Sequence, residues 1–179
     1  MLDKEKTGLI VVDIQGKLAR IVDNSSALIA NCQKLIKGAQ AIGLPIIYLE
    51  QTPDRLGSTV SELDSLLINS NPISKFTFNA CKEPKFIEAI QAEDVNTWLI
   101  CGIEAHICVY QTAMNLLELN YQIQLVNDCI SSRTLENKNL AINKLIHKGA
   151  DNTAVEMCLY ELVKDCRAPE FKQVLSLVR

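Results

Sequence analysis

The sequence has no apolar run long enough to span a bilayer and no excess of basic residues. A transmembrane helix needs about 20 predominantly apolar residues, so we expect no membrane partner. Lysine and arginine number 18 against 21 acidic residues, and this net charge of −3 argues against a nucleic-acid partner. No apolar signal core follows residues 1–6, so we expect a cytoplasmic location.

The sequence also lacks any Cys-x-x-Cys pair, although it has seven cysteines. An odd number without that spacing favours neither a disulfide framework nor a zinc knuckle. We therefore expect free thiols in a reducing compartment, most of them packed as small hydrophobic side chains. At most one or two should be reactive.

No repeat, low-complexity tract or linker interrupts the chain, so we expect a single domain over residues 1–179. Apolar runs typical of buried strands alternate with helical patterns. This alternation predicts an α/β fold, a three-layer α/β/α arrangement with a mainly parallel, Rossmann-like central sheet. Strands are predicted at 8–14, 44–49, 95–101, 121–126 and near 152–155, and helices at 107–119, 136–148, 156–164 and 168–178, with one more beginning after Asp23 or Asn24 and ending at Gly43.

Polar residues follow several of the predicted strands, where ligands of parallel sheets bind. Asp13 ends the first strand, Glu50 and Gln51 end the second, and residues 102–108 follow the strand predicted at 95–101. A carboxylate in the position of Asp13 must be paired or hydrogen-bonded, and a functional role and a helix cap are about equally favoured. The irregular segment 51–83 is expected to form a wall or lid of a site.

Two further residues are candidates for chemistry. Cys108 is predicted in the first turn of a helix, where the helix dipole lowers a thiol pKa; the alternative is one more packed cysteine. Lys75 lies between Ile73, Phe76 and Phe78, and its residue type alone favours an exposed lysine whose stem covers apolar surface over a charge held in a cleft.

Three stretches together resemble a known family: residues 9–15 (LIVVDIQ), the segment around Lys75, and residues 101–109 (CGIEAHICV). In this order they resemble the isochorismatase-like cysteine hydrolases over nearly the whole chain. Residues 49–63 and 126–133 are most similar to the isochorismatase-domain-containing subgroup.

The resemblance implies a catalytic triad of Asp13, Lys75 and Cys108. Asp13 would take the thiol proton, Lys75 would stabilise the thiolate, and Cys108 would attack a carbonyl carbon of a small-molecule substrate. It also implies a cis peptide at Ile103–Glu104 and an oxyanion hole formed by the backbone N–H groups of Glu104 and Cys108. The activity implied is hydrolysis of a small amide or related C–N bond through a thioester, in a homo-oligomer.

Residues near the predicted strand ends are candidates for the pocket. Glu50 and Gln51 either contact substrate or hold loop backbone groups. Leu18 stands where nicotinamidases commonly carry an aromatic residue, which argues against nicotinamide as the substrate. The full set of pocket candidates is Gln15, Leu18, Glu50, Gln51 and Phe76.

The sequence departs from the metal-binding members of this superfamily. Nicotinamidases place an Asp-x-His motif where this chain has Glu50-Gln51-Thr52, and the only histidines here are His106 and His147. We therefore expect no metal site and no cofactor. Three alternatives stay open: an ester or imide hydrolase with the same triad, a non-catalytic binding protein, and a redox-responsive thiol protein.

Overall fold

The computed structural model describes residues 1–68 and 70–179 and has one six-stranded sheet at its centre. The strand order is β3-β2-β1-β4-β5-β6, and every neighbouring pair is parallel. The predicted α/β fold with a parallel sheet is therefore confirmed. The strands are β1 (Thr7–Val12), β2 (Ile46–Gln51), β3 (Ile73–Lys75), β4 (Thr97–Gly102), β5 (Gln122–Ile130) and β6 (Asp151–Thr153).

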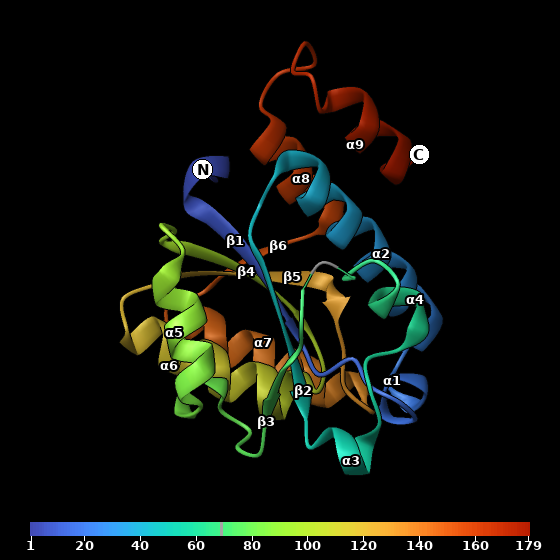
Figure 1. Ribbon diagram of the computed structural model, residues 1–179, viewed down its shortest axis with the longest axis vertical. Coiled ribbons are helices and arrows are strands. Elements are labelled where there is room, and N and C mark those ends of the chain that lie inside the picture. Colours follow the sequence, from blue (N-terminus) through green and yellow to red (C-terminus); the bar gives the residue numbers. More distant parts are fainter. Residues whose placement is uncertain (69) are drawn as a thin grey trace.

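Helices cover both faces of the sheet (Figure 1). The longest, α2, packs on one face with α8 and α9, whereas α5, α6 and α7 cover the other. The α-helices are α1 (Leu18–Ile21), α2 (Ser25–Ile42), α3 (Pro53–Leu56), α4 (Ser61–Asp64), α5 (Pro84–Ala92), α6 (Tyr110–Glu118), α7 (Leu135–His147), α8 (Val155–Val163) and α9 (Phe171–Val178). Three short turns are η1 (Lys4–Lys6) and η2 (Ala80–Lys82), both 3₁₀, and η3 (Ala105–Val109), which is π-helical. Among the described residues no helix is long and apolar enough to cross a membrane.

Alternation along each strand divides the core into two clusters. In β1, Leu9 and Val11 face the side of α2, whereas Ile10 and Val12 face the side of α5, α6 and α7. Successive side chains of a strand point to opposite faces, so the sequence of a strand that is covered on both sides is a continuous apolar run. Trp98 belongs to the second cluster and is fully buried, as its place in a strand predicts.

The main differences from the sequence prediction lie near the predicted strand ends and at α5, a helix that the sequence prediction does not include. The predicted helix 107–119 is a π-helical turn, η3, followed by α6. Strand β3 and helices α3 and α4 lie within the segment 51–83, which the sequence marks only as irregular. These elements are very short, and their position depends on pairing with β2 and on packing against α2.

Candidate active site

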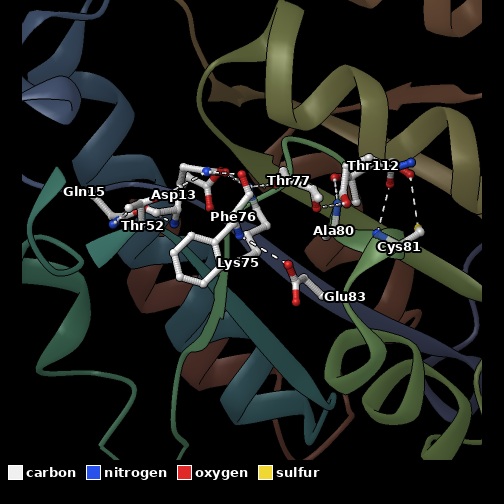
Figure 2. A network of polar contacts seen from close by, with 12 residues as sticks. Asp13, Gln15, Thr52, Lys75, Phe76, Thr77, Ala80, Cys81, Glu83 and Thr112 are labelled. Carbon is white, nitrogen blue, oxygen red and sulfur yellow. Dashed lines mark hydrogen bonds and ion pairs between the residues drawn. The ribbon is translucent and has the colours of Figure 1, made fainter. Parts of the chain in front are cut away.

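The carboxyl ends of β1, β2 and β3 bring a buried ion pair together. Lys75 Nζ lies 2.7 Å from Asp13 Oδ2 and 2.7 Å from Gln51 Oε1, and it also donates to the carbonyl oxygen of Thr77 at 3.3 Å. Gln51 and Lys75 are paired directly in the β2–β3 register, which places the two side chains beside each other. Figure 2 shows Lys75 between Asp13 on one side and Thr77 on the other.

Lys75 is fully buried, so the surface position that its residue type favours is wrong. Its three N–H donors have three protein acceptors, and one of these is a carboxylate, which is the condition under which a buried ammonium is tolerated. The segment that follows it is anchored to α6, because the N–H of Ala80 donates to Thr112 Oγ1 at 3.1 Å (Figure 2).

Asp13 is not a helix cap but the acidic partner of this lysine. Its backbone has a left-handed φ of 51°, and its N–H donates to the carbonyl oxygen of Leu49. Burial raises the pKa of its carboxyl group, and the nearby Lys75 ammonium opposes that rise. Within the described part of the chain Asp13 Oδ1 accepts no hydrogen bond, so this oxygen is available to take a proton.

Cys108 lies in the π-helical turn η3, directly after β4. The chain enters this turn through Gly102, whose φ is +130° and where an added Cβ would lie 2.1 Å from the carbonyl oxygen of Val12. The next peptide, Ile103–Glu104, is cis, as the family resemblance implies. The close approach of β4 to β1 sets the position of Cys108 relative to Asp13.

The thiol of Cys108 does not have the lowered pKa expected from a helix first turn. Burial, and then the negative charge of Asp13, raise the pKa of Cys108 to about 12, while the charge of Lys75 acts in the opposite direction. The difference from the expected thiol pKa has a simple physical reason. The thiol is removed from water and lies near a carboxylate, and both effects disfavour the thiolate. Cys108 therefore rests as a neutral thiol near a group that can accept its proton.

A small cavity of about 130 Å³ opens beside Asp13 and Cys108, which both line it. Of the predicted pocket residues, Leu18 and Gln51 also line it. The residues that the sequence prediction missed are apolar, and they come from the irregular segment and from the turn around Cys108. They are Leu56, Phe78, Ile103 and Ile107.

The other three pocket candidates, Gln15, Glu50 and Phe76, lie outside this lining. Gln15 is buried and holds two segments together: its Oε1 accepts from the N–H of Gln51, and its Nε2 donates to the carbonyl oxygen of Gly57. The side chain of Phe76 is 75% exposed. Its backbone carbonyl oxygen accepts a hydrogen bond from Gln51 Nε2 at 2.9 Å and so helps to fix the Gln51 amide.

Glu50 takes the second of the two roles left open for it, that of holding loop backbone. Its Oε1 accepts from both the N–H and the Oγ1 of Thr59, at 2.7 and 2.8 Å. With the Gln15 contact to Gly57, this anchors the loop that carries Leu56 at the edge of the cavity. The sequence gives only a weak signal for such a role, because a buried glutamate that binds substrate and one that binds loop backbone have the same sequence pattern.

Glu104 lines the same cavity and has a partner of its own. Its Oε1 accepts from both the backbone N–H and the Nε of Arg133, at 3.1 and 2.9 Å. Glu104 is 5% exposed, whereas the Arg133 side chain extends toward solvent. The charges around the cavity are thus arranged as two pairs, Lys75 with Asp13 and Arg133 with Glu104.

Larger hollows lie elsewhere, and two of them have more than four times the volume of this cavity. One, of about 600 Å³, lies beyond β5 and β6 and is lined by residues that include Asn31, Asp128 and Lys138. The other, of about 630 Å³, lies between the end of α2 and residues 65–70. Size alone therefore does not identify the site, because Asp13 and Cys108 line the smaller cavity. No group of three or more histidine, cysteine or acidic side chains is placed to hold a metal ion in the described residues.

Known proteins of one family are similar to this chain. The isochorismatase domain family matches residues 7–157. Isochorismatase domain-containing protein 1 of Danio rerio is 31% identical over 93% of this chain, which spans 59% of the length of that relative. The secreted isochorismatase effector Isc1 of Phytophthora sojae is 29% identical, and the match covers 96% of this chain and 83% of the effector.

Solved structures show the same fold. The MAR1 ribonuclease of Caenorhabditis elegans has a TM-score of 0.93 and 32% identity, covering 99% of this chain and 91% of its own. The Escherichia coli YcaC protein, described as an octameric hydrolase of unknown specificity, has a TM-score of 0.93 at 22% identity, covering 98% and 89%. The chain belongs to the isochorismatase domain family and has its hydrolase fold.

Proposed function

We propose that the protein is a cysteine hydrolase that cleaves a small amide or related C–N bond. The observation that carries this proposal is the buried Lys75–Asp13 ion pair, whose free carboxylate oxygen shares a cavity with the Cys108 thiol. A neutral thiol, a base and a fixed cation in one water-poor site are what nucleophilic acyl transfer requires.

In the proposed reaction Asp13 takes the thiol proton as the Cys108 sulfur attacks the carbonyl carbon. The raised pKa of Asp13 suits it to this exchange, since the carboxyl group can then return the proton to the leaving amine. A water molecule hydrolyses the thioester and regenerates the thiol. Lys75 keeps the carboxylate in place and offsets the negative charge that forms on sulfur.

We assign the oxyanion donors to the backbone N–H groups of Glu104 and Cys108. The neighbouring amides have other acceptors: Ala105 donates to the carbonyl oxygen of Ser131, and those of Ile107 and Val109 donate to the carbonyl oxygen of Glu104. Donors that are fixed before the reaction stabilise the developing oxyanion without reorganisation.

A cytoplasmic homo-oligomer is part of the same proposal. The E. coli relative is described as an octamer, and apolar side chains are exposed here on α7, where Leu140 is 58% exposed. All seven cysteines are free, which suits a reducing compartment. Sedimentation velocity tests the oligomer, and a purely monomeric protein at micromolar concentration contradicts it.

The ribonuclease relative raises RNA cleavage as a rival activity. The cavity argues against it, because 130 Å³ is too small for a nucleotide and the charges that surround it are already paired. The overall charge of −3 also gives no attraction to a phosphate backbone.

Ammonia release from a panel of small amides tests the proposal, with matched esters and a labelled single-stranded RNA beside them. We expect amide turnover that falls about a thousandfold or more in Cys108→Ala and is unchanged in Cys166→Ala, which alters an exposed thiol. Rapid quenching and peptide mass spectrometry should find the acyl group on Cys108. Turnover that survives Cys108→Ala, ester cleavage without amide cleavage, or Cys108-dependent RNA cleavage would overturn it.

A further inference from the structure

The hydrogen bonds around the cavity leave few polar atoms for a ligand. Lys75 uses its three donors on Asp13, Gln51 and Thr77, and both N–H bonds of the Gln51 amide are used as well, on Thr52 Oγ1 at 3.2 Å and on the Phe76 carbonyl oxygen at 2.9 Å. A side-chain ammonium has three donors and a side-chain amide NH₂ has two, so both groups are fully used.

Each charged side chain of the cavity lining also has a partner of opposite charge. Lys75 pairs with Asp13, and Arg133 pairs with Glu104 from outside the cavity lining. No unpaired cation lines the cavity in the part of the chain that the structure describes. A carboxylate entering it would find no unpaired cation, and an ammonium would find only carboxylates that already have a cation, so burying either charge there is strongly unfavourable.

The remaining lining is apolar, and the space is small. Five of the nine lining residues are leucine, isoleucine or phenylalanine: Leu18, Leu56, Phe78, Ile103 and Ile107. A dry apolar cavity of about 150 Å³ holds a benzene molecule, so 130 Å³ accepts a group of about six carbon atoms or fewer. Leu56 and Phe78 are 37% and 53% exposed, so they form the rim between this space and solvent.

From these contacts we infer that the substrate is an amide of a short, uncharged, apolar acid, and that Leu56 on the rim is a specificity-determining residue. The acyl group, straight or a single ring, sits against Leu18, Ile103 and Ile107. Amides that carry a carboxylate or an ammonium on the acyl group are excluded, because the lining has no unpaired cation and both of its carboxylates, Asp13 and Glu104, are already paired with cations. This inference rests on the proposed amide hydrolysis.

The first measurement compares kcat/KM for butyramide with that for succinamate, which has a similar length and ends in a carboxylate, and for 3-aminopropanamide, which carries an ammonium. We expect butyramide to be favoured by about a hundredfold or more over either charged amide. The second measurement needs no turnover. It compares the rates of alkylation by iodoacetamide and iodoacetate at Cys108, each divided by the rate at the exposed Cys166 of the same molecule.

A charge added to the rim provides the decisive variant. Leu56→Lys places a cation at the cavity, and it should raise the relative rates of succinamate and iodoacetate by about tenfold. Leu119→Lys is the matched control, because Leu119 is 47% exposed and lies outside the cavity lining. It should leave both ratios unchanged. Thermal unfolding of the two variants confirms that each is folded.

The outcomes separate this inference from the function on which it rests. Turnover of succinamate equal to that of butyramide overturns the neutral-substrate inference and leaves amide hydrolysis in place. Equal relative alkylation by the two reagents, or no response to Leu56→Lys, also overturns it. If no amide is hydrolysed but Cys108 still prefers iodoacetamide, the amide hydrolase proposal fails, whereas the preference of the cavity for uncharged ligands is supported.

Discussion

Lys75 Nζ lies 2.7 Å from Asp13 Oδ2, and the two side chains are only 0% and 3% exposed. The two residues are 62 positions apart in the sequence, and their pair joins the ends of β1 and β3, which are separated in the sheet by β2. An ion pair in this position is weak evidence for stability, because removing both charges from water costs about as much as their attraction returns. Because the pair lies beside Cys108, we attribute its presence to the proposed reaction rather than to stability.

Replacing one member of this pair should lower the free energy of unfolding. Lys75→Met leaves the Asp13 carboxylate buried without its cation, and we expect the free energy of unfolding to fall by about 3–5 kcal/mol. Urea denaturation at pH 7 measures the change. The double variant Asp13→Asn, Lys75→Met should recover part of this loss, because it removes both charges.

The exposed Arg20–Glu62 pair, with an N–O distance of 2.8 Å, provides the control. Arg20→Met should cost less than about 1 kcal/mol, since solvent screens this pair. A Lys75→Met protein as stable as Arg20→Met would show that Asp13 and Lys75 do not form a charged pair.

The pH dependence of activity should reflect the environment of Asp13. The proposed reaction needs the carboxylate form, and burial raises the Asp13 pKa above its ordinary value of 3.8. We therefore expect kcat/KM to fall as the pH drops through that raised pKa, at a higher pH than an ordinary carboxyl group would give. Without substrate, alkylation of Cys108 should keep rising above pH 9, because its thiol pKa is about 12. A plateau of Cys108 alkylation below pH 8 would contradict this assignment.

Much of the architecture follows from local sequence patterns. Continuous apolar runs and helical spacing predict the strands β1, β2, β4, β5 and β6 and the helices α2, α6, α7, α8 and α9, because a strand pattern indicates burial on two faces and a helical pattern indicates burial on one. The positions of Asp13 and Cys108 at strand ends follow from the same reasoning. Only the family resemblance indicates Lys75, since its burial depends on β3 pairing with β2.

The cavity rim is harder to predict for the same reason. Leu56 and Phe78 belong to a segment with little regular structure, and distant contacts fix its course. Glu50 holds Thr59, and Gln15 holds Gly57. Such side-chain to backbone contacts leave no periodic signal in a sequence. The pKa of Cys108 is likewise set by burial and by Asp13 rather than by its place in a turn.

The buried thiols should make the protein less stable in alkali. Burial raises the pKa of Cys158 from 9.0 to about 12, so between these values the folded protein keeps a proton that the unfolded chain has lost. The folded state then binds more protons, and stability falls as pH rises, by up to about 1.4 kcal/mol per pH unit for each such group.

Urea midpoints between pH 8 and pH 10.5 measure this dependence. In Cys158→Ser the fall with pH should be less steep than in the natural protein, whatever the absolute cost of the substitution. The matched control is Cys166→Ser at an exposed thiol, which should leave the slope unchanged. Equal slopes for all three proteins would mean that Cys158 does not resist ionisation in the folded state.

Gly102 offers a final test, because it couples the backbone of β4 to the position of Cys108. A Cβ there would lie 2.1 Å from the Val12 carbonyl oxygen, which also accepts from the N–H of Ile103 at 2.9 Å. Gly149 is the matched control: its φ is +103° against +130° for Gly102, but an added Cβ would meet nothing within 4 Å. Gly149→Ala should therefore cost only the backbone strain, about 1–3 kcal/mol.

Gly102→Ala should cost that strain and a further 1–3 kcal/mol or more, about what overpacking costs. It should also lower kcat about a hundredfold in the protein that remains folded, because a displacement of about 1 Å between Cys108 and Asp13 disrupts proton transfer during attack. Activity per folded molecule, corrected by the unfolding curve, separates the two effects. If Gly102→Ala matches Gly149→Ala in both measurements, the approach of β4 to β1 does not set the geometry of the site.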